Sequence, residues 1–337
     1  RLRSAENYWV PVLTQRMVSI YRAARSVFGD ALVLPGSTNI VICSVNPLQR
    51  DPAVSVERLL ERRIAARLVS PAFIQYLYRN DRFSQVARIL ETGSAPENTD
   101  ARPICYQYTA VLWLSKFYPA MTRMDFSGIA ARAVQPALRD WLGFGVSLVL
   151  LTLIRSRPAL RRALFMGLTG LLGMLVETTL ILHYQVKNGV LFQDLGVLLM
   201  SFMAGLTMGA IAMGPEARAQ CNGALSRFSI AGLVLVLSFI PLGVWIAYRS
   251  NTGAGMGLME TSVLLAASGF LVAGVFAYAS KSRSSHQQDL IAPLYSADVI
   301  GGCIGSVAGT LFLIPILGLA ATSIWMIPFA ILAALLA

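Results

Sequence analysis

The stretch "LLGMLVETTLILH", residues 171 to 183, places one carboxylate in the middle of an apolar run. No lysine or arginine lies within nine positions of Glu177 on either side. If this stretch crosses a bilayer, an ionised Glu177 near the hydrocarbon centre costs roughly 3 kcal/mol or more. We therefore expect Glu177 to be neutral, to be paired, or to face a polar cavity.

The composition of the whole chain is typical of a multi-pass membrane protein. Of its 337 residues, 55% are hydrophobic and 13% are charged, and the mean hydropathy is +0.61. These values are too apolar for a soluble chain. The net charge of +11 comes largely from arginines beside apolar stretches, which predicts contact with anionic lipid headgroups rather than with nucleic acid. The four cysteines form no CxxC pair and there are two histidines, so we expect no metal site.

Six apolar runs approach the roughly 20 residues that are needed to cross a bilayer core. None of them contains lysine or arginine. The connecting loops that begin at 155, 214 and 281 hold eight cations, whereas the opposite loops hold only Lys187 and Arg249. The positive-inside rule therefore places the eight cations in the cytoplasm. The predicted spans cover residues 163–183, 191–213, 228–248, 258–280, 294–314 and 319–337.

A seventh apolar run, "WLGFGVSLVLLTLI" at residues 141–154, is short for a span. As a helix it rises only about 21 Å. Its unbroken hydrophobicity and the Trp141 anchor favour spanning, which would place residues 1–140 outside the cell. If the run is interfacial or re-entrant, residues 1–140 are cytoplasmic. Because arginines flank both ends, the charge pattern leaves both alternatives open.

Glycines recur at helical spacing within the spans. Gly301, Gly305 and Gly309 form a GxxxGxxxG pattern, and Gly205 and Gly209 form a shorter one. In lipid, small residues let two helix backbones approach closely. We expect these faces to contact other helices, and the alternative is that glycine is simply common in transmembrane segments.

The first 140 residues carry most of the charge and alternate helix and strand patterns. Residues 10–29 have helical spacing, and "DALVLP" and "NIVICSV" indicate two strands separated by a turn. The second strand is apolar on both faces at Ile40, Val41 and Ile42, which predicts a covered position in an α/β sheet.

Short helices are expected after the two strands. Asp51 fits an N-cap and Pro52 the first helical position, and residues 91–103 form a polar loop. There are too few strands for a whole α/β domain. We therefore interpret residues 1–120 as the C-terminal part of such a domain, residues 121–140 as a linker, and residues 141–337 as a transmembrane helical domain.

Several of these stretches resemble one family. Residues 4–45, 70–90 and 95–117 resemble the C-terminal part of the aminopropyltransferase domain in bacterial membrane-fused spermidine synthase-like (polyamine aminopropyltransferase-like) proteins. Residues 173–210 and 294–322 are similar to the transmembrane half of that family. The resemblance implies a Rossmann-like, methyltransferase-type fold and a location in the bacterial inner membrane.

The family's chemistry depends on parts that this sequence does not contain. The resemblance implies a Gly-rich loop that holds decarboxylated S-adenosylmethionine and a catalytic Asp that deprotonates the amine acceptor. No GGGDG-like loop follows a strand here, and the segment with the catalytic Asp would lie upstream of Arg1. We expect a transferase-like chain without catalytic residues or cofactor, acting as a membrane scaffold or docking subunit. The alternative is aminopropyl transfer to putrescine by a full-length protein.

Two residues in the polar loop are candidates for a substrate cleft. Asn98 and Asp100 match the family's "N-T-D-x-R-P-I" stretch, and Pro35 to Asn39 match its "P-G-x-T-N" turn. One interpretation is that Asn98 and Asp100 cap the following segment through side-chain to backbone hydrogen bonds. The other is that Asp100 lines the open end of a substrate cleft.

Glu177 also has two interpretations. The six-span half resembles half of a major-facilitator-type fold, so Glu177 is a candidate proton or cation site of a proton-coupled transporter. Alternatively, it is a structural carboxyl that is neutral or hydrogen-bonded to Thr178, Thr179 or His183. Besides the lipid bilayer, other membrane subunits are the expected partners.

Overall fold

The structure is a computed structural model, and it separates the chain into two compact units. It describes residues 2–3, 10–36, 38–64, 67–119, 158–189, 191–213, 232–252, 255–280 and 287–336. The α/β unit comprises Arg1–Thr99 and Pro103–Ala131, and the helical bundle comprises Asp100–Arg102 and Arg132–Ala337. The predicted linker at 121–140 and the seventh apolar run at 141–154 lie outside the described residues.

The sheet of the α/β unit is small and antiparallel. Its order is β1-β3-β2, and Val33 in β2 pairs with Val41 in β3. A Rossmann-like fold is built on a mostly parallel sheet with crossover helices, so the Rossmann-like remnant remains a prediction. The strands are β1 (Leu2–Arg3), β2 (Asp30–Leu34) and β3 (Thr38–Ser44).

The prediction that the second strand is covered on both faces is wrong. β2 is buried along its whole length, whereas Ile40 of β3 is 43% exposed. Val33 and Val41 share a core cluster with residues of the first and fourth helices. Those helices therefore cover the face of Val33 and Val41. On the opposite face Leu34 of β2 is buried, whereas its partner Ile40 in β3 is exposed.

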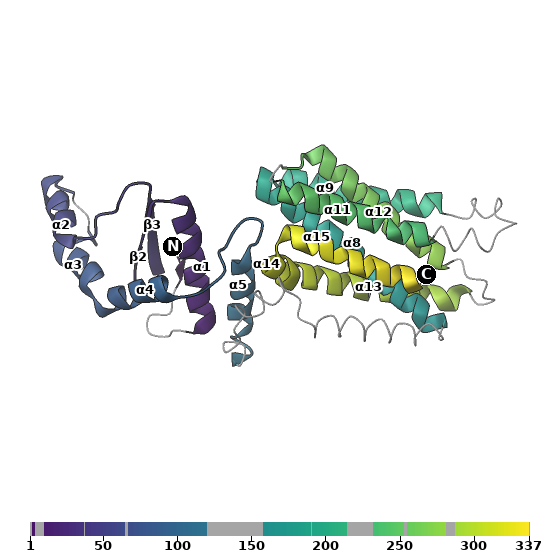
Figure 1. The fold of residues 1–337 in the computed structure, drawn as a ribbon, viewed down its shortest axis with the longest axis horizontal. Helices are drawn as coiled ribbons and strands as arrows, with labels where there is room; N and C mark the ends of the chain where they lie inside the picture. Colours follow the sequence, from purple (N-terminus) through teal and green to yellow (C-terminus); the bar gives the residue numbers. More distant parts are fainter. Residues whose placement is uncertain are drawn as a thin grey trace. The chain divides into compact units, whose positions relative to one another are not determined.

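Five helices complete the described part of this unit (Figure 1). Asp51 accepts a hydrogen bond from Ala53 N at 2.9 Å, so it is the N-cap that the sequence predicts. Ser70 and Asn80 cap the next two helices in the same way. The helices are α1 (Pro11–Val27), α2 (Pro52–Glu61), α3 (Pro71–Arg79), α4 (Asp81–Thr92) and α5 (Ile104–Leu114).

The bundle contains six described segments that are long and apolar enough to cross a membrane, which confirms the six predicted spans. The largest difference from the prediction is that the first span continues from His183 to Asn188, because the helix extends through polar residues that hydropathy excludes. The elements are α8 (Pro158–Asn188), α9 (Phe192–Ala212), α11 (Phe239–Asn251), α12 (Leu258–Ser280), α13 (Gln287–Ala308), the π-helix η3 (Gly309–Leu313), α14 (Ile314–Leu317) and α15 (Leu319–Leu336). Residues 232–237 are also helical and extend the span that contains α11.

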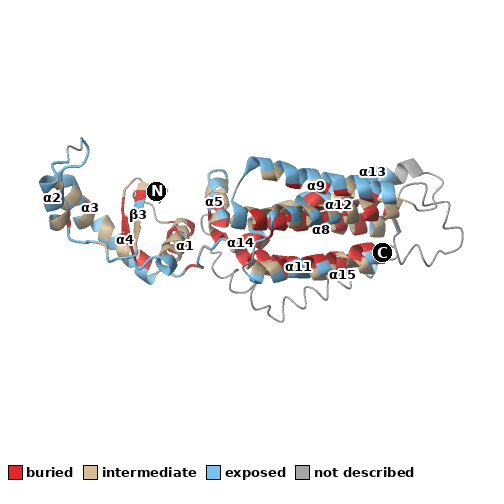
Figure 2. Cartoon of the chain, turned by 90° about the horizontal axis from the view of Figure 1, so that it is seen from above, coloured by how far each residue is buried: buried red, intermediate tan, exposed pale blue. Residues whose placement is uncertain are grey.

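Two pairs of helices dominate the packing, α9 with α12 and α8 with α13. The pairs α11–α15, α8–α15 and α8–α12 follow with similar extents. α9 runs antiparallel to α8, since Tyr184 near the end of α8 donates to Asp194 near the start of α9 at 2.6 Å. α8 is the most buried of the six candidate spans and α9 the least. Figure 2 shows this contrast as red along α8 and pale blue along α9. α8 is therefore the central helix of the bundle.

Glycines bring the two dominant pairs into backbone contact. A Cβ added to Gly301 would lie 1.9 Å from Gly167 O, and one added to Gly305 would lie 2.5 Å from Leu171 O. Both helices advance four residues in the same direction between these contacts, so α8 and α13 are parallel. α9 and α12 are also parallel. Their contacts join Gly205 with Ala266 and Gly209 with Phe270. Gly309, the first residue of η3 after α13, lies against Leu175 of α8.

Candidate functional site

Glu177 lies near the middle of α8 and is only 8% exposed. No hydrogen bond or ion pair joins its carboxylate to another described residue. Two of the three neighbours that were expected to serve it have other partners. Thr179 Oγ1 donates to Leu175 O at 2.7 Å, and His183 Nδ1 lies 3.2 Å from Ser250 Oγ. The described part of the bundle therefore buries this carboxylate without the predicted hydrogen bonds.

The acids near the span ends are paired at one end of the bundle. Arg249 forms an ion pair with Glu260 at 2.8 Å and donates to Gly255 O at 3.0 Å. Trp245 Nε1 donates to the same carboxylate at 3.3 Å, and Asp194 accepts from Tyr184. These contacts join the ends of α8, α9, α11 and α12, so these two acids are explained as structural groups.

Asp298 lies at a close helix crossing nearer the other end of α8. A Cβ added to Gly170 would lie 2.7 Å from Asp298 Oδ1 and 2.3 Å from its backbone oxygen. Oδ1 is buried and has no hydrogen-bond partner among the described residues. The Asp298 residue as a whole is half-buried.

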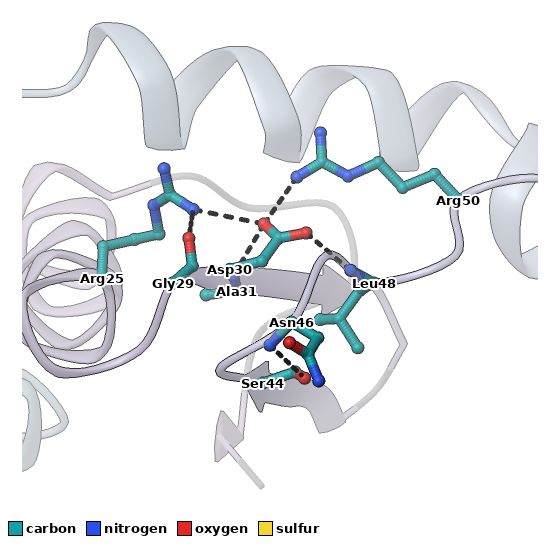
Figure 3. A network of polar contacts seen from close by, with 8 residues as sticks. All are labelled: Arg25, Gly29, Asp30, Ala31, Ser44, Asn46, Leu48 and Arg50. Carbon is teal, nitrogen blue, oxygen red and sulfur yellow. Dashed lines mark hydrogen bonds and ion pairs between the residues drawn. The ribbon is translucent and has the colours of Figure 1, made fainter.

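The α/β unit contains a buried carboxylate of the opposite kind. Asp30 at the start of β2 is 9% exposed, and Figure 3 shows four donors converging on it. The backbone N–H groups of Leu48 and Ala31 donate at 2.9 Å each, and Arg50 and Arg25 form ion pairs at 2.9 and 3.2 Å. The Leu48 N–H and the Arg50 charge hold the pKa of Asp30 below its usual range.

The substrate-cleft candidates occupy the loop before α5. Asn98 Oδ1 accepts from Cys105 N at 3.0 Å in the first turn of that helix, which is the capping bond that the first interpretation expects. Asp100 is exposed and lies in a turn. In the other matched motif, Asn39 Oδ1 accepts from Gly36 N at 3.2 Å and stabilises the turn between β2 and β3.

Two further features bear on ligands. Among the described residues, no group of three His, Cys, Asp or Glu side chains is placed to hold a metal ion.

A groove of about 360 Å³ lies between α11 and α12. Its lining is almost wholly apolar, so it suits hydrocarbon rather than a charged substrate. The lining residues are Ser238, Pro241, Leu242, Trp245, Leu264, Ala267, Phe270 and Leu271.

Comparison with protein-family models, with curated proteins and with solved structures finds no match to this chain.

Proposed function

We propose that this chain is a multi-pass membrane scaffold that carries the α/β unit and has no catalytic role of its own. The observation that carries the proposal is the pair of glycine contacts, α8 with α13 and α9 with α12, in which backbone meets backbone. Such contacts leave little room for adjustment and hold the helices in one register. A bundle of this kind is suited to anchoring.

The resemblance to membrane-fused spermidine synthase-like proteins supports the same proposal. In this view residues 1–120 are the end of a Rossmann-like domain and the bundle is half of a major-facilitator-type fold, in a bacterial inner membrane. The sequence has no Gly-rich donor loop after a strand. A full-length protein with that loop and the catalytic Asp would be the aminopropyltransferase, with decarboxylated S-adenosylmethionine as its donor.

The test combines a membrane assay with an activity assay. Membranes that contain the full chain are washed with alkaline carbonate, and the chain is expected to stay in the pellet. The same membranes are then incubated with putrescine and decarboxylated S-adenosylmethionine. Transfer would move the aminopropyl group from the sulfonium to a putrescine nitrogen, releasing 5′-methylthioadenosine and a proton.

We expect no spermidine above the level of membranes without the chain. Spermidine formation that depends on the chain would overturn the non-catalytic assignment. Release of the chain by the alkaline wash would overturn the anchoring role.

A further inference from the structure

Among the residues of the described bundle that are buried as a whole, most polar side chains have a hydrogen-bond partner and two do not. Ser262 Oγ and Asp298 Oδ1 are also buried without a partner, but their residues are only half-buried. Five buried hydroxyls donate to the backbone carbonyl four residues earlier in the chain, which is the usual arrangement for Ser and Thr in such helices. Ser268 on α12 is fully buried, yet its Oγ has no hydrogen-bond partner among the described residues. Glu177 is the other. The five partnered hydroxyls belong to Thr169, Thr179, Thr261, Thr322 and Ser323.

Two contacts fix the register between α8 and α12. A Cβ added to Gly173 would lie 2.5 Å from Val272 Cγ2. At the far end of α8, Asn188 Nδ2 donates to Met256 O at 2.9 Å. The two helices are antiparallel, because α12 is parallel to α9 and α9 is antiparallel to α8. Between the two contacts, nearly equal numbers of residues follow one another along each chain segment, in opposite directions.

This register places Glu177 level with Ser268. Glu177 lies one helical turn beyond Gly173, and Ser268 lies one turn before Val272. Residues four apart share a helix face. Because Gly173 and Val272 touch across the α8–α12 crossing, the two unpartnered side chains are on the facing sides of the same two helices.

No other titratable or charged group of the described residues lies at this level. α8 packs against α9, α11, α12, α13, η3 and α15. Toward one end the nearest groups are His183 and Tyr184, six and seven residues from Glu177, or roughly 10 Å along the helix. Toward that same end lie Lys187, Asp194, Tyr248, Arg249 and Glu260, and toward the other lie Arg161, Arg162, Tyr278, Tyr295, Asp298 and Cys303. η3 and α15 contain no titratable residue.

The crossing of α8 and α12 has a special position in the bundle. In chain order the most extensive packing joins span two with four and span one with five, followed by three with six, one with six and one with four. Span one, α8, therefore packs against all three of the later spans, and span four, α12, is one of them. Glu177 and Ser268 lie at the same level of this α8–α12 crossing.

The geometry points to a proton-binding site formed by Glu177 and Ser268 at the crossing of α8 and α12. We propose that Glu177 takes up and releases one proton and that the Ser268 hydroxyl donates to the carboxylate when the proton leaves. The ligand is a proton rather than a metal ion, because the two side chains supply three oxygen atoms and hard cations take six or more. Ionisable groups at membrane depth serve as proton relays in pumps and transporters.

The test uses dicyclohexylcarbodiimide, a lipid-soluble reagent that adds to protonated carboxyls with no leaving group. The purified full chain in phosphatidylcholine vesicles is labelled between about pH 5 and about pH 9, and mass spectrometry follows residue 177. We expect the labelling rate to fall by about tenfold or more across this range with a single midpoint. Failure of residue 177 to react at any pH, while Asp298 reacts, would overturn the proposal.

Ser268→Ala tests the second member of the site. Losing the hydroxyl removes a donor to the ionised form, so the midpoint is expected to rise by about one pH unit. Ser323→Ala is the matched control, because that hydroxyl already donates to Leu319 O, and it is expected to leave the midpoint unchanged. An unchanged midpoint in Ser268→Ala would remove Ser268 from the site.

Replacing choline chloride with sodium chloride at constant ionic strength tests the identity of the ligand. We expect no change in the labelling of Glu177, and protection by sodium would overturn the proton assignment. The site is independent of the scaffold role, since labelling can fail in a chain that stays in the membrane.

Discussion

Asp30 and Glu177 are both carboxylates with less than a tenth of their surface exposed, in two different units of the chain. Asp30 receives two backbone N–H groups and two guanidinium groups. Glu177 receives no hydrogen bond from any described residue. A buried charge persists only when donors compensate its lost hydration. The difference teaches that Asp30 is fixed as an anion by the fold, whereas Glu177 is left available for a proton.

The largest expected effect comes from breaking the frame that holds Glu177. In Gly301→Val, the new Cβ would lie 1.9 Å from the backbone oxygen of Gly167. Because two backbones, not a movable side chain, would have to separate, we expect loss of the monodisperse folded bundle, measured by size-exclusion chromatography in detergent.

Gly196→Val is the matched control for that substitution. Gly196 lies in α9, and nothing lies within 4 Å of the position of an added Cβ. We expect a normal elution profile. Folding of Gly301→Val with the same yield as Gly196→Val would contradict the backbone contact between α8 and α13.

The next largest effect is expected from Asp30→Asn. The change removes the charge that binds Arg25 and Arg50 and leaves Leu48 N with a poorer acceptor. The α/β unit should open more readily, measured by hydrogen exchange of β2 in the full chain. Asp51→Asn is the control, because Asn caps a helix about as well as Asp. Equal exchange in both variants would show that the Asp30 network contributes nothing.

Asp30 also predicts how the stability of the α/β unit depends on pH. Its pKa in the folded chain is lowered, chiefly by the Leu48 N–H and Arg50. The stabilisation is therefore present above the unfolded pKa of about 4 and is lost as the pH falls through the lower folded value. In hydrogen exchange, β2 of the unaltered chain should lose protection below about pH 4, and Asp30→Asn should flatten that dependence.

A smaller effect is expected from Asn98→Ala. The change removes the hydrogen bond to Cys105 N at the first turn of α5 and should cost about 1 kcal/mol of unfolding free energy, measured by denaturant titration. Asp100→Ala, at an exposed turn position, should cost less. If Asp100→Ala costs more than Asn98→Ala, the capping interpretation of Asn98 is wrong.

The smallest effect on stability is expected from Glu177→Gln. No described hydrogen bond is lost, and the amide is neutral at every pH, so the melting temperature in detergent should stay the same or rise. This result is opposite to that for Asp30→Asn. A fall in melting temperature would show that the ionised carboxylate stabilises the bundle and would remove the contrast between the two acids.

The sequence predicts the bundle well and the two sites only in part. A run of about twenty apolar residues has few alternatives to a membrane helix, so the six spans follow from hydropathy. Glu177 stands out because it interrupts such a run. Ser268 does not stand out, since its importance depends on the register between two helices nearly a hundred positions apart.

The α/β unit is harder to predict, because its contacts depend on tertiary pairing. The Asp51 cap follows from local pattern. The exposure of Ile40 does not, because an apolar strand carries no mark of how many of its faces are covered. The Asp30 network is likewise not visible in the local pattern, because two of its four partners, Leu48 and Arg50, follow Asp30 by 18 and 20 positions.

The order in which the helices leave the ribosome gives the parallel pairing of α8 and α13 a further consequence. α8 is synthesised first of the six described spans, but α12 and α13, which pack beside it, follow only after roughly ten seconds of translation. During that interval Glu177 has neither Ser268 nor the later helices around it. Protonation would keep Glu177 neutral while α8 remains in the lipid or the translocon. The proton that Glu177 exchanges in the assembled bundle would therefore also lower the cost of inserting α8.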